Sequence, residues 1–177
     1  MNNFRCIKII VITFFVIILS TQSKSEIKIA VVEMDVLMKK SLAGKSLIEQ
    51  LKKFDSKNKI FFNEEKKKLA LEKDKISAQK NILSKEEYEK KVISLNKKYT
   101  NFQKKAEEKL QSLKSKRDVA MKKILKEVTI VLSEYSSKNE LTFIIDQKNI
   151  IIGKTELNVT NKVLKLVDSR IKKVSLK

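Results

Sequence analysis

Residues 81–87, Asn-Ile-Leu-Ser-Lys-Glu-Glu, decide how this chain of 177 residues folds. Ser84 and Glu87 have the spacing of a capping box, in which each side chain satisfies a free N–H group at the start of a helix. No glycine or proline nearby offers a competing break. The stretch therefore predicts that the chain reverses direction at about residues 81–84 and that a new helix starts there.

Apolar residues recur with helical spacing on both sides of this reversal. After it, steps of three and four residues give the near-heptad stripe of a helix that lies along a partner, with one stutter after Ala106. The stripe contains Tyr88, Val92, Leu95, Tyr99, Phe102, Ala106, Leu110, Leu113, Ala120 or Met121, Ile124, Val128, Val131 and Tyr135. Before the reversal the stripe is looser: Leu47, Leu51, Phe54, Phe61, Leu69, Ile76 and Leu83, interrupted by Asn58, Glu65 and Glu72.

The two stripes predict an antiparallel helical hairpin over residues 43–138, with its tip near 81–84. At 1.5 Å per residue, each helix of this coiled-coil-like arm would be on the order of 70 Å long. A single continuous helical rod is the alternative that the pattern leaves open.

Short β-branched segments flank the predicted hairpin. Residues 27–34, Ile-Lys-Ile-Ala-Val-Val-Glu-Met, alternate as a strand does, and Asp35 after them is the expected N-cap of the next helix. Residues 141–146 predict a second strand. Residues 149–152 predict a third, after a turn at Gln147-Lys148.

An amphipathic closing helix is expected from about Val159 to Lys172, capped by Asn158 or Thr160. Because a hairpin returns its ends to the same place, strand 27–34 can pair with strand 141–146. The predicted fold is α+β, mainly α: a helical arm on a small β body, residues 26–42 and 139–177, that includes the C-terminal helix. So small a body buries little apolar surface and has exposed strand edges, which favours assembly into an oligomer.

Residues 1–25 have the features of a secretory signal peptide. Arg5 and Lys8 precede the apolar run 9–19, and Ser23 and Ser25 stand where cleavage requires small residues. The run is too short to span a bilayer core of about 30 Å. Cleavage would leave residues 26–177 as one domain and would remove Cys6, the only cysteine. A retained membrane anchor is the alternative.

The composition after residue 25 favours binding over catalysis. It holds 37 lysine and arginine residues against 21 acidic ones, a net charge of +16, which implies anionic partners. The chain has no histidine, so the usual bases, nucleophiles and soft metal ligands are missing. Gly44-Lys45-Ser46 and Gly153-Lys154-Thr155 resemble the end of a P-loop but lack its first glycine. We expect no enzyme activity, no cofactor and no metal.

Aromatic residues spaced among the lysines of the arm are the candidate binding residues. They are Phe54, Phe61, Phe62, Tyr88, Tyr99 and Phe102. Most of them are expected to fill the seam between the two helices. Because Phe61 and Phe62 are adjacent, one helical face cannot bury both, and at least one ring is predicted to point away from the hairpin towards a partner chain or client.

Three short motifs, in order along the chain, resemble those of the Skp/OmpH family of periplasmic chaperones. Residues 28–35, Lys-Ile-Ala-Val-Val-Glu-Met-Asp, are similar to the first strand of that family and its entry into a helix. Phe143-Ile-Ile-Asp146 is similar to a later strand, and residues 158–164, Asn-Val-Thr-Asn-Lys-Val-Leu, to the C-terminal helix. The resemblance covers essentially all of residues 26–177.

This resemblance implies a homotrimer whose strands form a barrel-like body with three arms around a cavity. Unfolded outer-membrane proteins would be held there without ATP, and anionic lipid or lipopolysaccharide would be a further partner. The candidate residues of the oligomer body are Ile29, Val31, Phe143, Ile145, Val163 and Val167.

Two other classes of protein compete with a chaperone. A charge of +16 favours a nucleic-acid-binding protein, since counterion release lets almost any such protein bind DNA at low salt; the signal peptide argues against this role. A membrane-anchored coiled-coil stalk or adaptor would retain residues 4–19, but the two flanking strands do not suit it.

Overall fold

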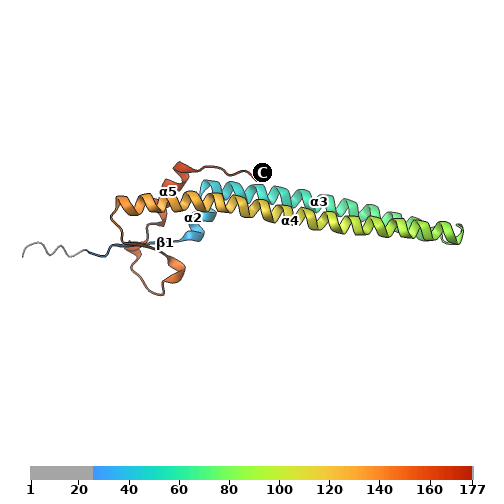
Figure 1. Ribbon diagram of the computed structural model, residues 1–177, viewed down its shortest axis with the longest axis horizontal. Coiled ribbons are helices and arrows are strands. Elements are labelled where there is room, and N and C mark those ends of the chain that lie inside the picture. The colour runs from blue at the N-terminus through green and yellow to red at the C-terminus, as the bar shows by residue number, and fades with distance from the viewer. Residues whose placement is uncertain (1–25, 177) are drawn as a thin grey trace, which may run out of the picture.

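The structure, a computed structural model, describes residues 26–176. Two long antiparallel helices, α3 (Leu42–Ala78) and α4 (Lys85–Lys138), project as an arm from a small body at one end (Figure 1). The 54 residues of α4 correspond to about 80 Å at 1.5 Å per residue. The predicted hairpin is thus present, and the continuous rod is wrong.

The tip of the hairpin is built by the predicted capping box. α3 ends at Ala78 with Gln79 as its C-cap, and Ser84 is the N-cap of α4. The Ser84 hydroxyl accepts the Glu87 N–H at 3.3 Å, and the Glu87 carboxylate accepts the Ser84 N–H at 3.2 Å. The Ser84 hydroxyl also donates to the Glu87 carboxylate at 2.9 Å. This bond first, and then the bond from the Ser84 N–H, hold the pKa of Glu87 below its ordinary value, so the carboxylate stays ionised at the helix start.

The body contains a two-stranded parallel sheet. β1 (Ile29–Val32) pairs with β2 (Phe143–Asp146), with Ile29 opposite Phe143. Parallel strands require a long crossover connection, and here the whole arm is that connection. The predicted pairing of the two segments is confirmed, over four residues of each.

The third predicted strand is wrong. A 3₁₀ turn, η1 (Gln147–Asn149), opens the segment, and Ile151 and Ile152 follow in a loop with 99% and 91% of their surface exposed. The chain pairs with the sheet only further on and at β1: the Val159 N–H donates to the Val31 carbonyl at 2.9 Å, and Val31 bridges to Asn158. A second 3₁₀ turn, η2 (Thr155–Leu157), precedes this bridge.

The helix caps of the body differ from those expected. α2 (Met34–Lys40) has Glu33 as its N-cap, and Asp35 lies in its first turn, 3.1 Å from the Lys39 amine. The closing helix, α5 (Thr160–Arg170), has Val159 as its N-cap without a side-chain bond. The side chains of Asn158 and Thr160 instead accept hydrogen bonds from other backbone N–H groups. The Asn158 side-chain carbonyl accepts the Thr160 N–H, and the Thr160 hydroxyl accepts the Glu33 N–H, both at 2.9 Å.

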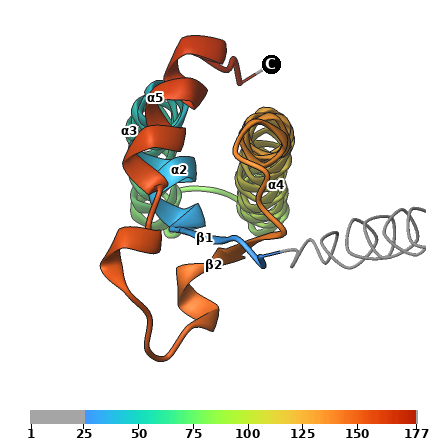
Figure 2. The ribbon, with the colours of Figure 1, turned by 90° about the vertical axis from the view of Figure 1, so that its left-hand side faces the viewer.

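A close junction joins α2 to α3 beside α5 (Figure 2). Ser41 is fully buried there, and its hydroxyl accepts the Gly44 N–H at 3.2 Å. The Asp168 carboxylate of α5 accepts the Leu42 N–H at 2.7 Å, which places a negative charge at the positive end of α3. A side chain at position 44 would overlap the Met38 carbonyl group, so only glycine lets the two helices approach.

Two apolar clusters hold the molecule together. The larger cluster joins the sheet, α2, α5 and the end of the arm that is next to the body. We call this end of α3 and α4 the root of the arm. The fully buried side chains of the larger cluster include Leu37, Ile124, Val128, Val163 and Val167. The smaller cluster lies near the tip and buries Leu69, Ile76 and Leu95. Between them, in the mid-arm (residues 52–68 and 96–119), no described side chain is buried.

Candidate functional site

The candidate aromatic residues of the arm fall into two groups. Tyr88, Tyr99 and Phe102 are half-buried around the apolar cluster near the tip. Phe54, Phe61 and Phe62 lie closer to the body, in the mid-arm part of α3. As expected, most of the rings therefore contribute to the seam between the helices, although none is fully buried.

Phe61 and Phe62 both contact α4, contrary to the prediction that one ring points away from the hairpin. Their ring centroids lie 5.6 Å apart, and Phe62 meets Phe102 edge to face at 6.2 Å. Both rings are half-buried. No described residue at this level of the seam is fully buried, so both adjacent rings fit between the two helices.

Lysine side chains from α4 lie over the rings of α3. The Lys109 Nζ is 4.7 Å from the centroid of Phe61, and the Lys116 Nζ is 5.9 Å from that of Phe54. Such cation–π contacts are worth about 0.5–1 kcal/mol at exposed sites, and long lysine side chains readily change rotamer. Phe54 keeps 38% of its surface exposed. These rings are consequently covered by groups that move aside at little cost.

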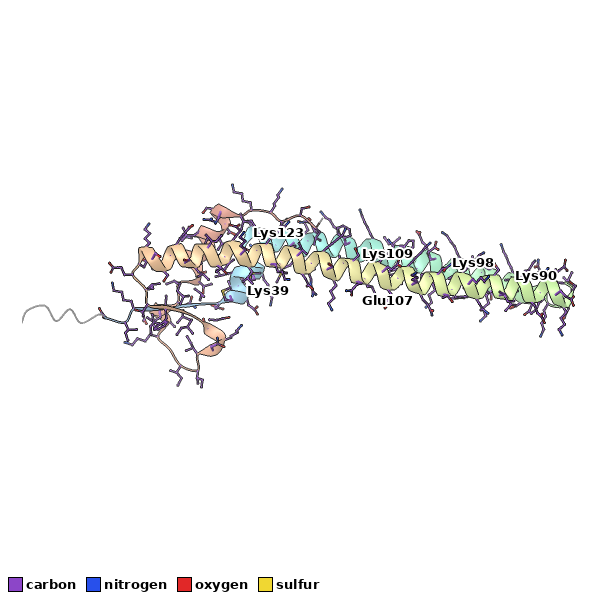
Figure 3. The ribbon with its side chains drawn as sticks, viewed as in Figure 1. Lys39, Lys90, Lys98, Glu107, Lys109 and Lys123 are labelled. Atoms are coloured by element: carbon purple, nitrogen blue, oxygen red, sulfur yellow. The ribbon has the colours of Figure 1, made fainter. Side chains whose placement is uncertain are left out.

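The surface of the arm is strongly basic. Lysine side chains project around its length, Lys90, Lys98 and Lys109 among them (Figure 3). Lys98 bridges the helices by pairing with Glu72 at 2.6 Å, whereas Lys90 and Lys109 form no ion pair within residues 26–176. Because both helices carry more basic than acidic residues, the arm presents a positive field to its surroundings.

Polar residues in the seam explain why the mid-arm is loosely packed. Asn58 and Glu65 of the mid-arm, like Glu72 nearer the tip, are half-buried at positions where the stripe of α3 predicts apolar side chains. A hydrogen bond from Lys68 is the main cause that lowers the pKa of Glu65, so this carboxylate stays ionised beside the seam. A charged group cannot be buried there without a large cost in hydration, which keeps the helices from closing tightly.

The outer face of the sheet carries an apolar patch. Ile29 and Phe143 face each other in the register and keep 37% and 56% of their surface exposed. Ile27 beside them is 65% exposed. Ile145 is half-buried, and Val31 is covered through its bridge to Asn158. An apolar strand face of this kind is typical of a surface that another chain covers.

Two of the six residues predicted for the oligomer body lie outside the apolar patch of the sheet. Val163 and Val167 are fully buried in the core of their own chain, where α5 packs on the root of the arm. Within one chain these two valines belong to the buried core and are not part of the exposed patch. The exposed side chains of Ile151 and Ile152 are not predicted from the sequence, because the run Ile150-Ile151-Ile152 directly before Gly153 has the composition of a strand.

Neither a metal centre nor a membrane-spanning helix is found in the described part of the chain. Within residues 26–176, no group of three acidic, histidine or cysteine side chains is placed to hold a metal ion. No helix of this part of the chain is long and apolar enough to cross a membrane. The predicted signal peptide and the alternative anchor at 4–19 both lie outside the described residues. The fold thus defines the class of the protein: a basic helical-hairpin arm carried by a small, mainly helical body with a two-stranded sheet.

Comparison with known proteins identifies the family. The profile of the family "Outer membrane protein (OmpH-like)" matches residues 28–167, most of the chain. The chain therefore belongs to the OmpH-like family, as the sequence motifs indicated. Family membership supports a chaperone role. No curated protein matches the chain.

A solved structure from Caulobacter crescentus CB15 has a similar fold. It is described as a candidate outer-membrane chaperone (OmpH-like) and superposes with a TM-score of 0.79. The match covers 88% of this chain and 92% of that one at 17% sequence identity. At this sequence identity the comparison shows a shared fold: a mostly helical chain with a two-stranded sheet and a C-terminal helix.

Proposed function

We propose that this protein is an ATP-independent periplasmic holdase chaperone. It binds unfolded outer-membrane proteins in a cavity between helical arms and prevents their aggregation on the way to the outer membrane. The observation that carries the proposal is the mid-arm, where aromatic rings lie half-exposed under lysine side chains. Membership of the OmpH-like family, which is generally non-enzymatic and periplasmic, supports the role and the compartment.

The chemistry of the mid-arm suits a client without fixed structure. An unfolded chain offers apolar side chains in no set order, so a partner needs many weak contacts rather than one shaped pocket. Phe54 and Phe61 become accessible when Lys116 and Lys109 change rotamer. Contacts that are individually weak let the client shift and leave without an energy source, which an ATP-independent holdase requires.

The positive charge of the arm attracts a client over longer distances than the contacts with the aromatic rings do. Long-range attraction raises the rate of association, with less effect on final affinity. Negatively charged clients, and anionic lipid or lipopolysaccharide, are the partners that this charge favours. Nucleic acid is not proposed as a physiological partner, because export by a cleaved signal peptide at residues 1–25 separates the protein from it.

The apolar patch on the sheet supports assembly, which we propose to be a homotrimer. Ile27, Ile29 and Phe143 would be covered by the equivalent face of another subunit. The body is too small to bury this surface by itself. Association through the patch would leave the arms free, so that several arms together enclose a space for one client.

Aggregation of an unfolded outer-membrane β-barrel tests the holdase directly. Residues 26–177 at stoichiometric concentration and without nucleotide should suppress light scattering by the client. The variant F54A/F61A should lose more than half of this effect. The matched control I60A/L71A removes exposed apolar side chains from the same helix and should retain it. Unchanged aggregation with the unaltered protein would contradict the proposal.

Assembly is tested by light scattering across a dilution series. The unaltered chain should have the mass of a trimer that persists on dilution, and F143K should dissociate it. I82K, at an exposed site on the tip, is the control and should leave the mass unchanged. A monomer or dimer of the unaltered chain would remove the cavity from the mechanism.

A further inference from the structure

The chain beyond α5 is bound along the root of the arm. Residues 171–176, Ile-Lys-Lys-Val-Ser-Leu, which we call the tail, follow Arg170 and leave the helix in an extended conformation, with Ile171 at φ −135° and ψ 115°. Figure 1 shows the tail running from the end of α5 along the root of the arm. The tail lies outside the part of the chain that matches the family profile, residues 28–167.

Gln50 of α3 recognises the backbone of the tail. Its side-chain amide donates to the Val174 carbonyl at 2.6 Å, and its carbonyl accepts the Leu176 N–H at 3.3 Å. The same amide donates to the Ser46 carbonyl at 3.2 Å, which fixes its orientation. One side chain therefore satisfies an acceptor and a donor on the same edge of an extended segment, as a neighbouring strand would. This recognition is independent of the bound side chains.

The last three described residues of the tail, Val174, Ser175 and Leu176, alternate between buried and exposed, whereas Lys172 and Lys173 before them are both exposed. Val174 and Leu176 keep 6% and 7% of their surface exposed and belong to the core cluster that includes Leu47. Ser175 between them is exposed. Alternation with a period of two is that of a strand with one face buried. The groove beside Gln50 thus selects an extended segment with apolar residues at every second position.

We propose that this groove is a binding site for extended, alternately apolar segments and that the tail occupies it in cis. Main-chain bonds that give affinity, with apolar sites for alternate side chains, are the usual basis of such recognition. The strands of outer-membrane barrels have the same alternation, apolar on the lipid face and polar inside. The natural ligand would then be a strand of the unfolded client, an assignment that rests on the proposed function.

The attachment of the tail is suited to exchange. Arg170, at the start of the tail, forms ion pairs with Glu127 at 2.8 Å and Glu134 at 2.9 Å on α4. These pairs hold the end of α5, so the tail can leave the groove while the helix stays in place. A tethered segment acts at a high effective concentration and excludes free peptides. A client segment already held by the arms has the same advantage and displaces the tail.

The test uses the variant V174S/L176S, which keeps α5 and Arg170 but removes the apolar anchors of the tail. The probe is a peptide with the sequence of residues 171–176. The control peptide has Ser175 and Val174 exchanged, so that its apolar residues are adjacent. Binding is followed to millimolar concentration by nuclear magnetic resonance of the Gln50 side-chain amide, assigned with Q50N. A chain shortened after Lys172 serves as a second emptied variant.

In both emptied variants the probe should shift the Gln50 resonance saturably, at a concentration at least tenfold lower than in the unaltered chain. The control peptide should bind at least tenfold more weakly than the probe. A Gln50 resonance that fails to respond in both variants, or that responds equally to both peptides, overturns the inference. Because the readout contains no client, it separates the two proposals: aggregation suppressed without a Gln50 response refutes only the groove. A Gln50 response without suppression refutes only the holdase.

Discussion

The root of the arm and the mid-arm are made from the same two helices but are held together differently. At the root, α3 and α4 pack with α5 around fully buried side chains such as Ile124 and Val128. In the mid-arm, half-buried rings and polar residues meet, and lysines lie over the rings. The difference shows that one hairpin can supply a rigid anchor at one end and a compliant surface beyond it, because stability follows local packing.

The largest expected effect tests whether the root carries the stability. Ile124→Ala removes a fully buried side chain of α4 and should lower the free energy of unfolding by about 3 kcal/mol, from lost burial and the cavity left behind. Chemical denaturation followed by circular dichroism measures it, at one fixed protein concentration because association shifts apparent stability.

The matched control lies on the same helix in the mid-arm. Leu110 is 57% exposed, although the apolar stripe predicts it in the seam, and Leu110→Ala should change the stability by less than about 0.5 kcal/mol. Equal losses at Ile124 and Leu110 would mean that the mid-arm is as tightly packed as the root. The comparison between the two regions would then fail.

The two glycines provide the next largest contrast. A methyl group at Gly44 would overlap the Met38 carbonyl group at the junction of α2 and α3, so Gly44→Ala should cost about 2 kcal/mol or more. At Gly153 the nearest atom is a side-chain carbon of Ile150 at 3.3 Å, in an exposed loop. Gly153→Ala should stay within about 0.5 kcal/mol. Thermal unfolding of both variants measures the difference, and a tolerated Gly44→Ala would show that the junction can open.

The sequence predicts the hairpin because its signals are local. The capping box at Ser84 and Glu87 needs only residues three apart, and the stripe of α4 repeats over many turns. The pairing of the two strands follows from the return of the hairpin. The family resemblance also depends on short motifs in order along the chain.

Features set by distant contacts could not be predicted. Asp168 lies 126 residues from the Leu42 N–H group that it caps, and Gln50 lies 124 residues from Val174. The loop at Ile151 has the composition of a strand, but it is Asn158, later in the chain, that bridges to Val31 of β1. In the candidate site the rings were predictable from composition, whereas the lysines over Phe54 and Phe61 depend on how α3 and α4 are placed.

A smaller effect should follow from completing the seam of the mid-arm. Asn58 is half-buried in the stripe of α3, and Asn58→Leu should add apolar contacts worth about 1 kcal/mol. Hydrogen exchange resolved by residue should slow in residues 52–68 and 96–119. Asn63→Leu, at an exposed position of the same helix, is the control and should leave exchange unchanged. Equal exchange in both variants would mean that Asn58 does not set the compliance of the mid-arm.

An effect of similar size is expected at the end of α4, where the arm returns to the body. Glu140 has φ 54°, the only non-glycine residue with positive φ in the described chain. The Leu141 N–H donates to the Ser136 carbonyl at 3.0 Å, and the Glu140 N–H donates to the Ser137 carbonyl at 3.3 Å. These two bonds form a Schellman motif, which normally has glycine at this position. Glu140 also pairs with the exposed amine of Lys28 at 2.8 Å.

Two substitutions separate the backbone from the ion pair. Glu140→Ala and Glu140→Gly both remove the contact with Lys28, which is exposed and contributes little, but only glycine adopts a left-handed conformation without strain. The glycine variant should therefore be more stable than the alanine variant by about 1 kcal/mol, while the greater entropy of glycine in the unfolded chain keeps it close to the unaltered protein. Thermal unfolding measures the order. If alanine were the more stable, the turn at Glu140 would relax without cost, and the root would share the compliance that distinguishes the mid-arm.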